Sequence, residues 1–233
     1  MIKGILFDLD DTLYPEKQFV MSGFRAVASY LSKKYGMDSD YIFSILKEDF
    51  ENGLRKRNLD VVLQKLGMED ENTPDVVRIF REHKPTISLY PEVRPILDWS
   101  KKRFKLGLIT DGYIITQRNK IHSLKIEDYF DVIIINDISK GCSKIDKEPF
   151  LKALSEINFN AQDVVYVGDN PAKDFVRAKE IGIHTIRIIR GASEYSGITV
   201  DKSFEAEYII RNLGELPSLI SIINRKYAGS EEK

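Results

Sequence analysis

The fold is decided by residues 2–14, which read Ile-Lys-Gly-Ile-Leu-Phe-Asp-Leu-Asp-Asp-Thr-Leu-Tyr. The run from Ile2 to Phe7 predicts a short buried strand that stops at Asp8. In an extended chain, residues two apart face the same side, so Asp8 and Asp10 should project together beyond the strand. Two carboxylates this close repel each other unless a cation or a shared proton intervenes, and Mg²⁺ is the cation that oxygen ligands favour. Taken alone, the stretch is explained equally well as an aspartate-rich turn that ends a strand.

Short β-branched runs alternate with helical patterns along most of the chain. The further predicted strands are residues 106–110, 132–135, 164–167, 185–189 and 208–210, and the helices between and after them are residues 92–104, 114–124, 147–157, 171–181 and 216–227. This order is typical of an α/β fold, in which a Rossmann-like parallel sheet is covered by helices on both faces. In such folds ligands bind at the carboxyl ends of the strands.

Residues 17–89 interrupt this alternation, because they show helical periodicity and no convincing strand. Four helices are expected there, and the last should begin at Thr73, whose side chain can cap it, with Pro74 in its first turn. The sequence therefore predicts a core domain of residues 1–16 and 90–233 with an inserted all-α helical bundle, residues 17–89.

Composition narrows the class of protein. The chain has 233 residues, with 35 Lys and Arg against 36 Asp and Glu, and a net charge of −1. Because it carries no excess of positive charge that could attract a polyanion, no nucleic-acid partner is expected. No apolar run approaches a membrane span, so no membrane partner is expected. The single cysteine, Cys142, suggests a reducing compartment, and we expect a cytoplasmic protein. Nothing in the sequence determines the oligomeric state.

Polar residues follow three other predicted strands. Thr110, Asp111 and Gly112 end one of them and offer a hydroxyl and backbone N–H groups at a helix start, which suits an anion. A second is followed by residues 168–174, Gly-Asp-Asn-Pro-Ala-Lys-Asp, and a third by a lysine-bearing loop, residues 140–147. Because parallel strands end at one edge of a sheet, these acids, the hydroxyl and a lysine are expected to meet there.

With these motifs in order, the chain resembles the haloacid dehalogenase superfamily of hydrolases that use an aspartate nucleophile, in the branch whose helical cap follows the first motif. Asp8 to Thr12 matches the family's D-x-D-x-T motif, Thr110 the second motif, Lys144 the third, and residues 168–174 the fourth, G-D-x-x-x-x-D. The resemblance covers nearly the whole chain, and the first and fourth motifs are highly specific when they occur together.

The chain departs from the family pattern at two positions. Asp111 stands where asparagine is commoner, so its side chain either contacts substrate or only shapes the turn. Ile145 follows the motif lysine where proline is usual. Three lysines compete for the third motif, and Lys144 is preferred to Lys140 and Lys147 because the residues around it match those of relatives. A solvated surface lysine is the simpler explanation for each of the other two.

The resemblance implies a magnesium-dependent phosphomonoesterase. Asp8 would attack phosphorus to form an aspartyl-phosphate, and Asp10 would serve as general acid and then as general base. Mg²⁺ would be held by Asp8, the Asp10 carbonyl and Asp169, while Asp174 would contact a metal-bound water or orient the lysine. The phosphate-binding residues would be Thr110, Asp111 and Lys144.

Other activities on the same core remain open at this point. A phosphomutase shares the machinery, and a dehalogenase uses the same nucleophile without a metal, although relatives with that activity lack the second aspartate, here Asp10. A non-catalytic binding protein would be expected to have lost one of Asp8, Asp10 and Asp169. The substrate is expected to be a small phosphorylated metabolite, either a sugar phosphate or a nucleoside monophosphate, selected by the cap.

Overall fold

A computed structural model describes residues 1–54, 58–68, 70–191, 193 and 195–228. Its centre is a six-stranded sheet with the strand order β3-β2-β1-β4-β5-β6, in which every neighbouring pair is parallel. The strands are β1 (Gly4–Phe7), β2 (Lys105–Gly112), β3 (Val132–Asp137), β4 (Val164–Gly168), β5 (His184–Ile188) and β6 (Tyr208–Ile210). The predicted α/β class and parallel sheet are confirmed.

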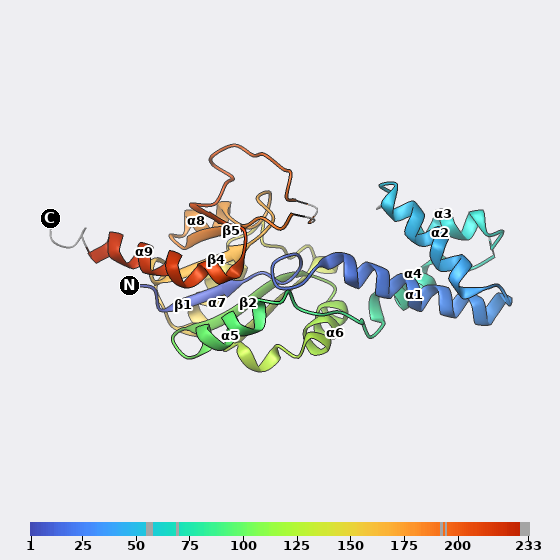
Figure 1. The fold of residues 1–233 in the computed structure, drawn as a ribbon, viewed down its shortest axis with the longest axis horizontal. Helices are drawn as coiled ribbons and strands as arrows, with labels where there is room; N and C mark the ends of the chain where they lie inside the picture. The colour runs from blue at the N-terminus through green and yellow to red at the C-terminus, as the bar shows by residue number, and fades with distance from the viewer. Residues whose placement is uncertain (55–57, 69, 192, 194, 229–233) are drawn as a thin grey trace.

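Two hydrophobic layers cover the two faces of the sheet. Along β1, Ile5 and Phe7 pack into one layer and Leu6 into the other, because successive side chains of a strand point to opposite faces. The first layer contains side chains of α5 (Val93–Lys101), α6 (Ile114–Leu124) and α9 (Leu216–Ala228), and the second those of α7 (Glu148–Ile157) and α8 (Val176–Glu180). Figure 1 shows these helices on either side of the strands.

Most predicted elements are found within a few residues of their expected bounds, but the helix predicted over residues 171–181 is wrong in its first half. Only Val176–Glu180 is helical there. The preceding residues form a turn in which the Asn170 N–H donates to the Asp174 carboxylate and the Asp174 N–H donates to the Asn170 carbonyl. A carboxylate that binds its own loop in this way competes with helix formation.

The interrupting segment forms α1 (Glu16–Tyr35), α2 (Ser39–Glu51), α3 (Asn58–Lys65) and α4 (Thr73–Glu82). These helices share a buried cluster that includes Phe24, Leu46 and Val76, and Figure 1 shows them grouped at one end of the molecule, beyond the sheet. One detail differs from expectation: Asn72 occupies the cap position of α4 and Thr73 is already helical. No helix in the described part of the chain is long and apolar enough to cross a membrane.

The register of the sheet determines which residues meet at its carboxyl edge. Phe7 lies beside Leu108 of β2 and Val167 of β4. Asp8 and Asp169, which directly follow β1 and β4, therefore lie at nearly the same level as Thr110 near the end of β2. The chain then turns sharply, with Asp11 in the left-handed conformation at φ 51°, before α1 begins. A polar pocket opens at this edge.

Candidate active site

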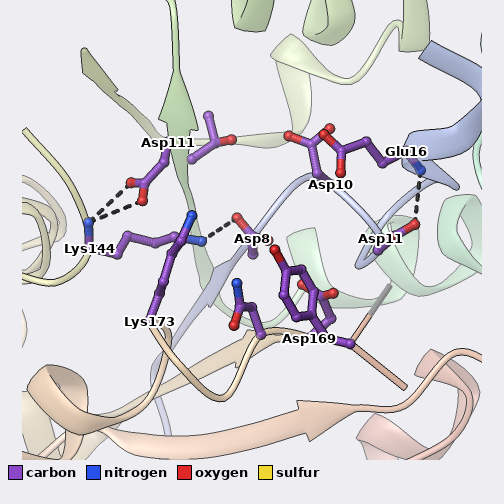
Figure 2. A pocket seen from close by; sticks show the side chains of 11 residues that line it. Asp8, Asp10, Asp11, Glu16, Asp111, Lys144, Asp169 and Lys173 are labelled. Carbon is purple, nitrogen blue, oxygen red and sulfur yellow. Dashed lines mark hydrogen bonds and ion pairs between the residues drawn. The ribbon is translucent and has the colours of Figure 1, made fainter. Parts of the chain in front are cut away.

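A pocket of about 130 Å³ lies at the carboxyl ends of β1, β2 and β4 (Figure 2). It is lined by Asp8, Asp10, Asp11, Glu16, Thr110, Asp111, Lys144, Asp169, Asn170, Lys173 and Tyr195. Six of the seven site residues expected from the sequence therefore line one pocket. The seventh, Asp174, is fully buried behind it and contacts Lys144.

Lys144 is the buried cation of the site. Its ammonium lies 2.6 Å from an Asp8 oxygen and 2.7 Å from an Asp174 oxygen, and its side chain is 5% exposed. Burial alone would lower the pKa of Lys144, but the negative charges of Asp174 and Asp8 raise it well above its ordinary value, so the ammonium stays charged. In contrast, Lys140 is exposed and Lys147 pairs with Glu180 at the surface.

Three buried carboxylates, those of Asp8, Asp169 and Asp174, have oxygens within 4.8 Å of one another. Burial raises the pKa of Asp8 to about 7 although Lys144 opposes it, and burial with the charges of Asp174 and Asp8 raises the pKa of Asp169 to about 10. Oδ2 of Asp169 is buried and has no hydrogen-bond partner among the described residues. Three carboxyl groups share one lysine here, so their full ionisation is disfavoured unless a further cation is present.

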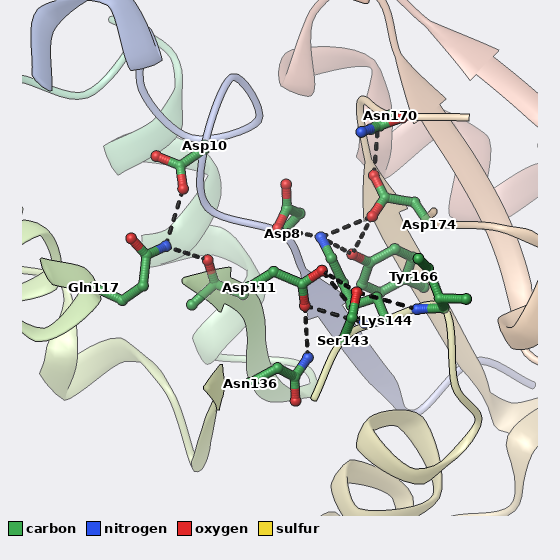
Figure 3. Close-up of polar contacts among 12 residues, drawn as sticks. Asp8, Asp10, Asp111, Gln117, Asn136, Ser143, Lys144, Tyr166, Asn170 and Asp174 are labelled. Atoms are coloured by element: carbon green, nitrogen blue, oxygen red, sulfur yellow. Dashed lines mark hydrogen bonds and ion pairs between the residues drawn. The ribbon is translucent and has the colours of Figure 1, made fainter. Parts of the chain in front are cut away.

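Asp174 occupies a different position from the other two. One of its oxygens contacts Lys144 and accepts a hydrogen bond from the Tyr166 hydroxyl, and the other accepts one from the backbone of Asn170 (Figure 3). Both oxygens are thus engaged by protein groups. Of the two roles considered for Asp174, the arrangement favours orientation of the lysine.

Asp10 has partners of its own, on the opposite side of the pocket from Lys144. Its Oδ1 accepts from the Lys120 ammonium at 2.7 Å and from the Tyr14 hydroxyl at 2.5 Å, and its Oδ2 accepts from the Gln117 amide at 3.0 Å. Burial would raise the pKa of Asp10, but the charge and hydrogen bond of Lys120 outweigh it and hold this pKa below its ordinary value. The environments of the two aspartates of the first motif thus act in opposite directions, because they raise the pKa of Asp8 and lower the pKa of Asp10.

The Asp111 side chain is directed at the loop that carries Lys144. It accepts hydrogen bonds from the Asn136 amide at 2.8 Å, from the Ser143 hydroxyl at 2.7 Å and from the backbone N–H of Lys144 at 3.1 Å. Figure 3 shows these donors around the Asp111 carboxylate. This aspartate therefore fixes the third-motif loop, an arrangement that the sequence did not reveal.

Gln117 and Lys120 were also missed by the sequence argument, although a signal was present. Both lie on the buried face of α6, together with Ile121 and Leu124. Two polar side chains at positions where apolar ones are expected indicate a polar partner inside the fold. Their partners, Asp10 and Thr110, become visible only in three dimensions.

Gly168 illustrates how tightly this site is packed. A Cβ at this position would lie 2.4 Å from an Asp174 oxygen, and Asp174 is fully buried and held on both sides. We expect Gly168→Ala to cost about 1–3 kcal/mol in stability and, by displacing Asp174 and Lys144, about tenfold or more in turnover. Thermal unfolding and steady-state kinetics measure both effects, and unchanged turnover in the folded variant would contradict this role of the glycine.

Comparisons with known proteins agree with the geometry. Residues 5–188 match the haloacid dehalogenase-like hydrolase family. A glyceraldehyde 3-phosphate phosphatase of Methanocaldococcus jannaschii is 35% identical over 91% of this chain and 99% of its own length. Among solved structures, a phosphatase of this family from Thermococcus onnurineus is 26% identical with a TM-score of 0.62 over 94% of this chain and 98% of its own.

A 2-haloacid dehalogenase from Pseudomonas syringae is 25% identical with a TM-score of 0.65, over 95% of this chain and 99% of its own. The same architecture therefore occurs in relatives named as phosphatases and in one named as a dehalogenase. Taken together, the parallel sheet, the polar edge and these matches show that the chain belongs to the haloacid dehalogenase-like hydrolase family.

Proposed function

We propose that the chain is a magnesium-dependent phosphomonoesterase that works through a covalent aspartyl-phosphate on Asp8. The observation that carries the proposal is the buried group of Asp8, Asp169 and Asp174. The buried ammonium of Lys144 contacts this group, and a further aspartate, Asp10, is held separately beside it. Phosphoryl transfer requires a nucleophile, positive charge around the phosphoryl oxygens and a proton for the leaving oxygen, and this pocket contains a candidate for each.

Each residue has a role in this proposal. Asp8 attacks phosphorus while the bond from phosphorus to the leaving oxygen breaks, and Asp10 gives that oxygen a proton. In the second step Asp10 takes a proton from the water that attacks the aspartyl-phosphate, which releases inorganic phosphate and restores Asp8. Thr110 and Lys144 bind phosphoryl oxygens, and Asp111 contributes by holding the loop of Lys144.

The donor set fits a magnesium ion. Carboxylate oxygens are the ligands that this ion prefers, and the buried Asp169 oxygen without a partner leaves a ligand position for it. Asp8, Asp169 and the backbone carbonyl of Asp10 would hold the ion, and Asp174 would support them through Lys144. When bound, the ion supplies positive charge that offsets the repulsion between the carboxylates and the phosphate.

Residues 17–89 would act as the cap that selects the substrate, and the core would comprise residues 1–16 and 90–233. In support, α1–α4 have a buried cluster of their own, and the insertion begins directly after Glu16, which lines the pocket. The substrate would be a small phosphorylated metabolite. Of the two classes considered, a sugar phosphate is favoured, because the Methanocaldococcus relative acts on glyceraldehyde 3-phosphate.

Purified protein should be screened against phosphorylated metabolites, beginning with glyceraldehyde 3-phosphate and including nucleoside monophosphates, with inorganic phosphate as the readout. EDTA is expected to abolish turnover and added Mg²⁺ to restore it, because without a cation the carboxylate cluster repels the phosphate. Full release of phosphate by metal-free protein would contradict the proposed dependence on magnesium.

Binding of the ion can also be measured without turnover. Mg²⁺ at about one hundred times its dissociation constant should stabilise the folded protein by about 2.7 kcal/mol, which appears as a rise in the unfolding temperature. Asp169→Asn should remove this rise, whereas Asp131→Asn, at the opposite edge of the sheet, should retain it. Equal stabilisation of all three proteins would show that the ion binds elsewhere.

A further inference from the structure

Lys120 lies beside the catalytic pocket without lining it, in a setting that surface lysines do not share. It is 3% exposed, its ammonium contacts Asp10 at 2.7 Å, and that ammonium lies 4.4 Å from the centre of the Phe19 ring of α1. A buried ammonium is costly unless a specific anion compensates it, and Asp10 is the carboxylate that the structure pairs with it.

Gln117, one helical turn before Lys120, connects Asp10 with the phosphate side of the pocket. Its amide nitrogen donates to Asp10 at 3.0 Å and to the Thr110 hydroxyl oxygen at 2.5 Å, and Figure 3 shows its side chain pointing toward Asp10. Because a side-chain amide carries two N–H donors, it can serve both partners at once. Thr110 then accepts from Gln117 and keeps its own O–H for a phosphoryl oxygen.

The helix that carries both residues is fixed on its other side. Thr116 donates to the Arg81 carbonyl at 2.9 Å, and Asn119 donates to the Glu82 carbonyl at 2.9 Å, both at the end of α4. Gln117 and Lys120, which alternate with these two residues along α6, are buried and contact Asp10. The helix is therefore held between the inserted helices and the core, and Lys120 has little freedom to move away from Asp10.

From this geometry we infer that Lys120 is a positioning residue for the leaving-group step, which holds the Asp10 carboxyl in place and stabilises the carboxylate that remains after its proton has passed to the leaving oxygen. In that step the bond from phosphorus to the leaving oxygen breaks, the Asp8 oxygen bonds to phosphorus, and the proton moves from Asp10 to the leaving oxygen. The inference rests on the proposed function, because it makes Lys120 the residue that positions Asp10, the general acid of that reaction.

The dependence on the leaving group tests this role. An alkoxide leaving group must be protonated by the acid as it departs, whereas 4-nitrophenolate is a stable anion that departs with little protonation. We expect Lys120→Met to lower kcat/KM for glyceraldehyde 3-phosphate by about 10- to 100-fold, and for 4-nitrophenyl phosphate by less than about threefold. The ratio kcat/KM is chosen because it reports only the steps through departure of the leaving group.

Arg118→Met is the matched control, since it removes an exposed positive charge from the same helix. Its kcat/KM for each of the two esters should stay within about twofold of the wild-type value. Should Lys120→Met unfold at a much lower temperature, Lys120→Gln carries the same comparison, because its amide keeps a donor without the charge. If the Lys120 variants lost kcat/KM equally for the two esters, or for neither of them, the inference would be overturned.

A double-mutant cycle shows whether Lys120 acts through Asp10. In an Asp10→Ala background, assayed with glyceraldehyde 3-phosphate at high enzyme concentration, Lys120→Met should have no further effect beyond about twofold, because the acid that it positions is gone. If Lys120→Met lowered the activity of the Asp10→Ala variant as much as it lowers that of the wild type, the inference would be contradicted and the phosphatase proposal would remain intact. Turnover that persists in Asp8→Asn would instead refute the phosphatase proposal itself.

Discussion

Replacing Asp8 with asparagine is expected to reduce turnover by about a thousandfold or more, to the background rate, because the amide has the shape of the carboxylate but cannot attack phosphorus. The fold should survive. Asp8 lies among Asp169 and Asp174, so removing its charge relieves repulsion, and Lys144 keeps Asp174 as a partner.

Steady-state kinetics and thermal unfolding of Asp8→Asn should be measured beside Asp131→Asn. Asp131 precedes β3 at the opposite edge of the sheet and pairs with Lys105, so its variant should retain turnover within about twofold. Turnover close to wild type in Asp8→Asn would exclude Asp8 as the nucleophile.

Replacing Lys144 with alanine is expected to lower turnover by about a hundredfold or more, because Asp8 and the phosphate would then face each other without the ammonium between them. The variant should also be less stable, since buried Asp174 loses its compensating charge. Thermal unfolding therefore accompanies the kinetics and defines the temperature at which the folded variant is assayed.

Lys140→Ala and Lys147→Ala serve as matched controls in the same loop. Both side chains are exposed, and Lys147 pairs with the surface carboxylate of Glu180, so each change should alter turnover by less than about threefold. If either control lost its activity and Lys144→Ala did not, the third motif would be assigned to the wrong lysine.

The sequence predicts the sheet well because each strand is a short apolar run that ends at a polar residue. The strand over residues 208–210 and the helix over residues 114–124 are found at their predicted bounds. The meeting of Asp8, Thr110 and Asp169 could also be anticipated, since parallel strands bring their carboxyl ends to one edge.

What the sequence could not predict depends on side chains that approach from other elements. The Asp10 carboxyl binds Lys120, which is 110 residues away in the chain, and no local pattern reports such a pair. The turn over residues 170–174 replaces a predicted helix because the buried Asp174 carboxylate accepts from its own loop. Likewise, Asp111 holds the loop of Lys144, whereas sequence reasoning left it either in contact with substrate or shaping its own turn.

Trapping the covalent intermediate tests the central claim most directly. The enzyme is mixed with glyceraldehyde 3-phosphate and Mg²⁺, quenched during turnover and treated with borohydride, which reduces an acyl phosphate on aspartate to homoserine. Mass spectrometry of the peptide that contains residues 1–14 should then show homoserine at position 8, and aspartate there when substrate is omitted. Turnover with aspartate unchanged at position 8, or homoserine at any other position, would contradict the account.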